Sequence, residues 1–224
     1  MSVRQTNCPS CGGGLSFRPG TSVSVCTYCT SVVARTDRDL SLVGKAAELV
    51  DTHSPLWVGA MGTWQQTHFT VAGRTQLSHP AGGIWDEWYL AFDDGRWGWL
   101  ASAQGNWYLT FKSDSRTVLP RIEECRPGTS INIGTGGNWV VQEVGTATVR
   151  TAEGELPFYY SSGETYSYAD VTGPRGAYAT LDFSEDPAAF FLGRQISLDD
   201  LTIPGVADQP RGDTIATATL NCPH

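Results

Sequence analysis

The sequence lacks any apolar run close to the roughly 18–20 residues that a membrane-spanning helix needs. Its first residues, Met1 to Gln5, also lack the apolar segment of a secretory signal. We therefore expect a cytoplasmic protein with no membrane span. In such a reducing compartment, structural disulfides are rare and paired cysteines favour metal binding.

Charged residues are scarce, at 17% of the 224 residues, and the formal net charge is -8. Proteins that bind nucleic acid usually present a basic face to the phosphate backbone, so this balance argues against a nucleic-acid partner. Glycine (25), proline (12) and hydrophobic residues (40%) are plentiful instead. This composition favours an all-β protein with many turns and a sizeable core.

Common catalytic signatures are missing as well. The sequence contains no Gly-x-Ser-x-Gly elbow of the kind that presents a nucleophilic serine. Asp51, His53 and Ser54 could in principle form a triad, but neighbouring residues on one strand point in different directions. The spacing of His53, His68 and His79 fits no helical metal-binding motif. The sequence therefore predicts no catalytic residue.

Four cysteines near the N-terminus give the strongest positive signal. They follow the pattern C-x2-C-x14-C-x2-C and are Cys8, Cys11, Cys26 and Cys29. This pattern is close to the four-cysteine zinc motif, and four thiolates leave no open coordination position for catalysis. We predict a structural Zn2+ site in a zinc ribbon over residues 1–36. A thioredoxin-like redox pair is the alternative, but that motif should follow a strand and open a helix.

Two further cysteines lie outside this pattern. Cys125 follows two glutamates, with no neighbouring base or positive charge to activate it, so we expect an inert thiol. Cys222 lies in the segment Asn221-Cys222-Pro223-His224, which resembles Asn7-Cys8-Pro9. We expect residues 206–224 to be a linker followed by the start of a truncated second zinc knuckle.

The best-patterned region contains a hairpin between Trp85 and Trp99. Asp94-Gly95 is a strong turn signal, and a two-residue loop there would pair Phe92 with Trp97 and Leu90 with Trp99. A second turn at Gln104-Gly105 would add a third strand. Residues 121–205 repeat this style with fewer tryptophans. We therefore predict an all-β fold: a small zinc ribbon, then two tandem small β-barrel or rolled-sheet units over 40–120 and 121–205.

The middle of the chain resembles the bacterial domain-of-unknown-function 4178 family over about residues 40–205. The residues that carry the resemblance include Ser54-Pro-Leu56, Gly73-Arg74, Trp85-Asp-Glu-Trp-Tyr89, Gly98-Trp99-Leu100, Gln104-Gly105 and Gly154-Glu-Leu-Pro157. C-x2-C ribbons before and after such blocks look typical of that family. The family has no assigned chemistry, and the resemblance implies a setting related to bacterial membrane stress.

Tryptophan is concentrated in one region, since seven of the eight lie between positions 57 and 107. A small β unit could bury only some of them, so we predict a surface that binds another protein. Its residues would be Trp85, Asp86, Glu87, Trp88, Trp97, Trp99 and Trp107. Asp86 and Glu87 point to opposite faces of a strand and cannot act as an acid pair, but a carboxylate beside indoles can hold a cation.

Two alternatives remain open at this point. The tryptophans could simply fill a core, which aromatic residues often do. The protein could also be an enzyme that uses Asp86, Glu87 or histidines in a cleft between the two β units. An enzyme should have a concave pocket with convergent polar groups, whereas a binding module should have an open apolar patch.

Overall fold

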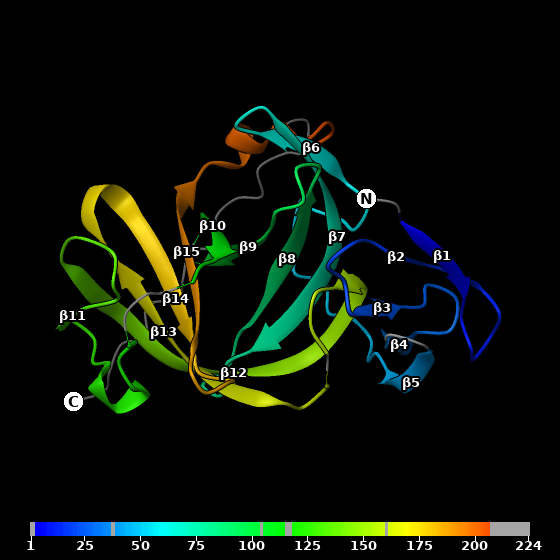
Figure 1. Cartoon of the computed structure of the whole chain (residues 1–224), viewed down its shortest axis with the longest axis horizontal. Coiled ribbons are helices and arrows are strands. Elements are labelled where there is room, and N and C mark those ends of the chain that lie inside the picture. The colour runs from blue at the N-terminus through cyan, green and yellow to red at the C-terminus, as the bar shows by residue number, and fades with distance from the viewer. Residues whose placement is uncertain (1–2, 37–38, 104, 115–117, 160, 207–224) are drawn as a thin grey trace, which may run out of the picture.

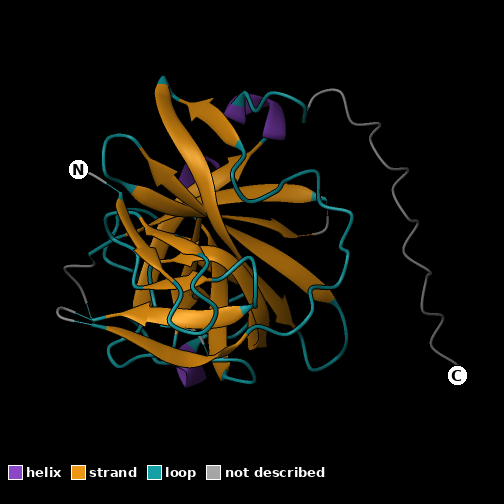
Figure 2. Cartoon of the chain, turned by 90° about the vertical axis from the view of Figure 1, so that its right-hand side faces the viewer, coloured by secondary structure: helices purple, strands orange, loops and turns teal. Residues whose placement is uncertain are grey.

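The computed structural model describes residues 3–36, 39–103, 105–114, 118–159 and 161–206. The predicted all-β class is confirmed: strands dominate, and helical structure is limited to short turns at the margins (Figure 2). None of the helices in the described part of the chain is long and apolar enough to cross a bilayer. The segment around Cys222, with its expected second knuckle, lies outside the described residues.

Eight antiparallel strands form a closed barrel (Figure 1). Around the barrel the order is β12, β7, β8, β9, β10, β15, β14, β13 and β12 again. Their bounds are β7 Thr67–Ser78, β8 Ile84–Phe92, β9 Trp97–Ala103, β10 Asn106–Lys112, β12 Trp139–Leu156, β13 Thr165–Thr172, β14 Ala177–Asp182 and β15 Ala189–Ile196. Closure leaves no free edge between the strands of the barrel.

One barrel therefore replaces the two tandem units expected from the sequence. Strand β12 pairs with β13 in its first part and with β7 in its second, and β10 pairs with β15. The β12–β7 and β10–β15 pairings join strands from residues 40–120 to strands from residues 121–205. The β10–β15 junction also depends on Gly193, because a Cβ there would lie 1.8 Å from the carbonyl oxygen of Leu109. Strand β15 was not anticipated from the sequence.

The hairpin between β8 and β9 forms, but its register differs by one residue from the prediction. Ala91 pairs with Trp97 and Tyr89 with Trp99, while Phe92 is bonded to Arg96. The loop has three residues, because Asp94 does not adopt the positive φ that a two-residue type I′ turn needs at both positions, and Gly95 (φ 88°) takes the left-handed position after a type I turn. A shift of one residue exchanges the two faces of a strand. Trp99 therefore shares its face with Tyr89 instead of Leu90.

Apolar clusters fill both sides of the barrel wall. On the outside of β7–β10, buried Trp88, Leu90 and Leu100 pack under the segments that carry Leu56 and Leu201. The covering elements include β6 (Met61–Trp64) and the short helix η3 (Leu198–Leu201), which Ser197 caps at its N-terminus. A second outer cluster contains Cys125, and burial raises the pKa of this thiol. It is crossed by β11 (Ser130–Ile131) and the helices η1 (Ile122–Glu124) and η2 (Pro174–Gly176).

The N-terminal strands lie to one side of the barrel, next to the end of β12 (Figure 1). They are β1 (Arg4–Asn7), β2 (Gly14–Phe17), β3 (Val23–Val25), β4 (Ser31–Arg35) and β5 (Leu40–Lys45). Strand β3 pairs with Glu155 and Leu156 of β12, so β3, β4 and β5 extend the sheet of the barrel, whereas β1 and β2 form a separate two-stranded sheet. Glu155 is 3% exposed, and its carboxylate accepts hydrogen bonds from Ser16, Arg18 and Thr21.

Candidate functional site: a thiol cluster and a barrel cavity

The four cysteines predicted as metal ligands come together in the N-terminal region. Their sulfur atoms all lie within 4.8 Å of one another. The Sγ atoms of Cys8 and Cys29 are 3.7 Å apart, and so are those of Cys11 and Cys26. A tetrahedral ion with metal–sulfur distances of about 2.3 Å would separate its ligands by about 3.8 Å. A disulfide needs about 2.05 Å, so the cluster is a candidate metal site with unbridged thiols.

Two tight turns place these thiols. In the β1–β2 loop the amide of Gly12 donates to the carbonyl of Cys8, and Gly12 has a left-handed φ of 78°. In the β3–β4 loop the amide of Thr30 donates to the carbonyl of Cys26 in the same way. Each turn aims its two sulfurs at a common point. Cys8 and Cys26 are buried, whereas Cys11 is exposed.

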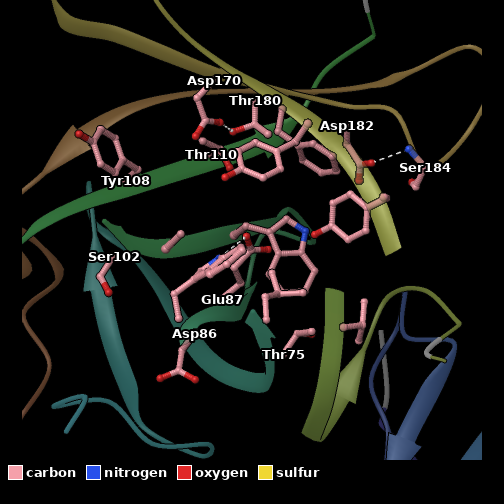
Figure 3. A pocket seen from close by; sticks show the side chains of 18 of the residues that line it. Thr75, Asp86, Glu87, Ser102, Tyr108, Thr110, Asp170, Thr180, Asp182 and Ser184 are labelled. Carbon is pink, nitrogen blue, oxygen red and sulfur yellow. Dashed lines mark hydrogen bonds between the residues drawn. The ribbon is translucent and has the colours of Figure 1, made fainter. Parts of the chain in front are cut away.

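A second site lies within the barrel, where a cavity of about 1110 Å³ is lined by alternate residues of the strands (Figure 3). This volume slightly exceeds the usual range for small-molecule pockets. Its aromatic lining includes Trp85, Trp97 and Trp99, and Phe191 of β15 lies beside Trp97. The rings of Trp97 and Phe191 are 6.3 Å apart between centroids. Phe158, from the β12–β13 loop, packs on Trp99 at 5.6 Å.

Three of the carboxyl groups that line the cavity have pKa values raised by burial, and they come from three different strands: Glu87 on β8, Asp170 on β13 and Asp182 on β14 (Figure 3). Burial raises the pKa of Glu87 to about 7, and the charges of Asp182 and Asp170 add to this shift. Burial also raises the pKa of Asp170 to about 6, against hydrogen bonds from Thr180 and Tyr178. The pKa of Asp182 is raised for the same reason.

Glu87 has few partners. The indole N–H of Trp85 donates to its carboxylate at 3.2 Å, and no ion pair to Glu87 exists among the described residues. Directly across the strand pair is Thr75, which is 2% exposed and also lines the cavity. The Thr75 hydroxyl has no hydrogen-bond partner in the described part of the chain. A buried hydroxyl without a partner is costly, so the site has unused capacity for a polar ligand.

The sequence-predicted partner residues are divided between the two faces of the barrel wall. Trp85, Glu87, Trp97 and Trp99 line the cavity. The carboxylate of Asp86 instead turns to the other face, where the Arg74 guanidinium binds it at 2.7 Å.

Two of the predicted tryptophans are not part of the cavity's aromatic wall. Trp88 is 1% exposed and lies under the same Arg74 guanidinium, which is 4.9 Å from its ring centroid. Trp107 is half-buried, lies at the border of the cavity and packs against the outer cluster. Tryptophans on both faces of one sheet explain how a small barrel accommodates so many.

The histidines do not converge on the buried carboxyl groups. His53 pairs with exposed Asp51 at 3.2 Å, but the hydroxyl of Ser54 bonds the amide of Leu56, so the three side chains form no triad. His68 bonds Thr63 on the neighbouring strand β6. His79 lines the cavity, and its ring bonds the amide of Ala81 in its own turn.

The acidic and tyrosine residues of the second half were missed from the sequence. Tyr166, Tyr168 and Asp170 alternate along β13, and Tyr178, Thr180 and Asp182 alternate along β14. All six line the cavity. The period of two was the available signal, since residues two apart share one face of a strand. Without the barrel closure, nothing in this pattern indicated that the face points toward Glu87.

Comparison with protein families agrees with the resemblance seen in the sequence. A family model described as Domain of unknown function (DUF4178) matches residues 57–198. The chain belongs to the DUF4178 family. The matched segment begins before β6 and ends at the start of η3, so it contains every strand of the barrel. No curated protein and no solved structure matches the chain. The DUF4178 match therefore assigns a family and leaves the chemistry to be argued from the site.

Proposed function

We propose that this DUF4178 protein is a non-enzymatic binding protein whose barrel takes an organic ligand into its cavity. The observation that carries the proposal is the cavity of about 1110 Å³, with its aromatic walls and a few inward polar groups. Eight-stranded barrels can hold one small ligand in this way. Binding sites are usually concave and apolar, with a small number of polar groups that fix orientation.

The cysteine cluster supports a structural role for zinc in the same protein. Thiolate is a preferred ligand of zinc, and the 3.7 Å sulfur–sulfur separations suit a tetrahedral ion. Four protein ligands would complete the coordination shell. The ion would then fix the two turns that carry the cysteines, and with them the small apolar cluster around Phe17 and Val33.

Binding to another protein remains part of this proposal. Phe158 and Tyr159 are exposed at the cavity, and a partner could insert a side chain there. The sequence suggested a continuous binding surface over Trp85–Trp107. The proposed contact at Phe158 and Tyr159 lies elsewhere, because Trp88 is buried and cannot be part of an exposed surface. A setting linked to bacterial membrane stress is implied by the family resemblance alone.

The cavity can be tested with N-phenyl-1-naphthylamine, a neutral dye whose fluorescence rises in apolar surroundings. We expect saturable enhancement with the wild-type protein. The variant Ala101→Trp places a large ring in the cavity opposite Glu87 and should weaken dye binding by roughly tenfold or more, about 1.4 kcal/mol. Met61→Trp adds the same ring at an exposed position of β6 and serves as the matched control. Absence of enhancement, or equal enhancement in both variants, would contradict the proposal.

An enzyme is the second candidate, and one observation favours it. Glu87 has a pKa of about 7 inside a concave pocket, which suits a general acid or base near neutral pH. The test is mass spectrometry of a bacterial metabolite extract after incubation with the protein. Catalysis would convert many molecules per chain, and Glu87→Gln would abolish the conversion. A binding protein would retain at most about one unchanged molecule in the barrel cavity.

A further inference from the structure

We propose that the ligand of the barrel cavity carries a positively charged organic ammonium group, held between Glu87 and Thr75 beneath the tryptophan wall. This inference rests on the proposed binding function and names the chemical class of its ligand. The shared chemistry is an alkylammonium attached to an apolar body. It could come from a free amine or from a lysine side chain of a peptide.

The charge of the cavity lining is the first argument. Besides Asp86, whose carboxylate is paired with Arg74, the acidic residues that line it are Glu87, Glu143, Glu164, Asp170, Asp182 and Glu185. The basic residues among the described lining residues are Lys112, His53 and His79, and Lys112 lies near Asp182. An excess of carboxyl groups between low-dielectric walls attracts cations.

The second argument is the incomplete bonding of the two facing residues. Glu87 accepts one hydrogen bond, from Trp85, and a carboxylate has room for several more. Thr75 lies directly opposite on β7, and its buried hydroxyl oxygen is unpartnered within the described residues. An ammonium group has three N–H donors and no acceptor, so it can satisfy both oxygens at once. A neutral group could donate a hydrogen bond to the carboxylate but would leave its charge without a counter-ion, and an anionic group would be repelled.

The aromatic surroundings make an organic cation a better fit than a metal ion. In the described part of the chain, the four cysteines are the one set of possible ligands whose atoms lie close enough together to share a metal ion. The carboxyl oxygens of Glu87, Asp170 and Asp182 are too far apart to do so. Rings of Trp85, Trp97 and Tyr166 line the same space, and the faces of such rings attract ammonium groups. The remaining volume can hold an apolar body.

Three probes with one apolar body test the charge preference. They are 2-naphthylmethylamine, 2-naphthylmethanol and 2-naphthoate, each used to displace N-phenyl-1-naphthylamine at pH 8 in low salt. We expect the amine to displace the dye at concentrations at least about tenfold lower than the alcohol, and the carboxylate to be weakest. Displacement by a tripeptide, acetyl-Phe-Lys-Phe-amide, compared with its acetyl-lysine form, distinguishes a peptide source from a free amine.

Variants assign the preference to the two residues. Glu87→Gln should reduce the amine's advantage over the alcohol to about twofold or less, and Thr75→Val should reduce it in part. Glu123→Gln removes the same charge from an exposed position outside the cavity and should leave the preference intact. Circular dichroism and dye binding check that each variant is folded.

The pH dependence gives an independent readout. The groups that face Glu87 are Trp85 on its own strand, Asp170, Tyr166 and Tyr168 on β13, and Asp182 and Tyr178 on β14. Burial raises the pKa of Glu87 to about 7 and that of Asp170 to about 6, so both take up protons between pH 8 and pH 5 while the amine stays charged. Amine affinity should therefore fall on acidification, whereas alcohol affinity should not change.

The outcomes separate the two proposals. If the dye binds in the cavity but the amine has no advantage over the alcohol, the ammonium assignment is wrong and the binding function stands. The same conclusion follows if the advantage survives unchanged in Glu87→Gln. If the dye fails to bind in the cavity, the binding function itself falls.

Discussion

The thiol cluster and the barrel cavity assemble their groups in opposite ways. All four thiols come from two turns between positions 8 and 29, each turn being set by its own backbone hydrogen bond. The cavity carboxyl groups come from β8, β13 and β14, and they meet only because the barrel closes. The first site is therefore a property of local sequence. The second is a property of strand register, which a single turn residue can change.

The largest effect should come from removing a thiol. Cys26→Ser should reduce the bound metal from about one ion per chain to nearly none, because zinc sites of this kind need all four ligands. Residues 4–35 should then lose protection in hydrogen exchange, while the barrel keeps a cooperative transition. Elemental analysis of protein purified without added zinc measures the metal.

Cys125→Ser is the control for this variant, since that thiol lies in a separate cluster. A well-ordered N-terminal region without metal would overturn the zinc proposal. A disulfide between Cys8 and Cys29 would do the same. Either result would mean that the N-terminal region, like the barrel, is held together without a metal ion.

The junction between the two regions provides the next test. Glu155→Gln should destabilise the protein by about 2 kcal/mol, because it removes the charge that binds Arg18 and leaves that cation unpaired. Urea denaturation measures the change. Glu153→Gln, two residues away, is the control: its carboxylate is 36% exposed and 3.5 Å from Arg74, so less than about 0.5 kcal/mol is expected. Equal losses would mean that the two regions are not joined through Glu155.

A smaller effect of opposite sign is expected within the cavity. Glu87 has a raised pKa, so the folded state binds its proton more tightly than the unfolded state. Ionisation therefore opposes folding, and stability should fall as pH rises from about 4.5 to above 7. Glu87→Gln should stabilise the ligand-free protein at pH 8 by about 1–2 kcal/mol and flatten this dependence.

Thermal unfolding between pH 5 and pH 8 measures the effect of Glu87→Gln, and Glu123→Gln controls for net charge. A variant that is less stable than the wild type at pH 8 would show that Glu87 has a stabilising partner. That result would contradict the proposal that the cavity binds a cation.

The smallest change concerns the turn that sets the cavity face. Gly95→Ala should cost about 1 kcal/mol, because alanine is disfavoured at a left-handed φ. Gly44→Ala on the exposed strand β5 is the control, since that glycine has open space at its Cβ position and no positive φ. Chemical denaturation measures both. If the two variants lose equal stability, the three-residue loop is not what holds the register.

The sequence could predict those features that depend on neighbouring residues. The cysteine pattern identified the four thiols that come together, the composition and turn signals indicated the all-β class, and the Trp85–Trp99 pattern was part of the family resemblance. The hairpin was located correctly as well. Its loop length was not, because Asp94-Gly95 is compatible with either two or three loop residues, and the sign of the Asp94 φ decides between them.

The remaining features depend on contacts between distant residues. Nothing local to Trp139–Leu156 indicates that one strand pairs with β13, β7 and β3 in turn. Without that strand the chain divides naturally into two units, as the sequence pattern predicts. The cavity was missed for the same reason. Glu87 was predicted as part of a binding surface, because its neighbours Asp170 and Asp182 lie on strands of residues 121–205.

Barrel closure also sets an order for folding during synthesis. The last barrel strand, β15, ends at Ile196, and until it pairs with β10 and β14 those strands keep open edges. Open edges and apolar faces are prone to pair with other chains. All four clustered thiols lie before position 30, so they can come together on the ribosome well before the barrel closes. A nascent chain would thus hold an organised first module beside an incomplete sheet, and chaperones would be needed most over the interval from β10 to β15.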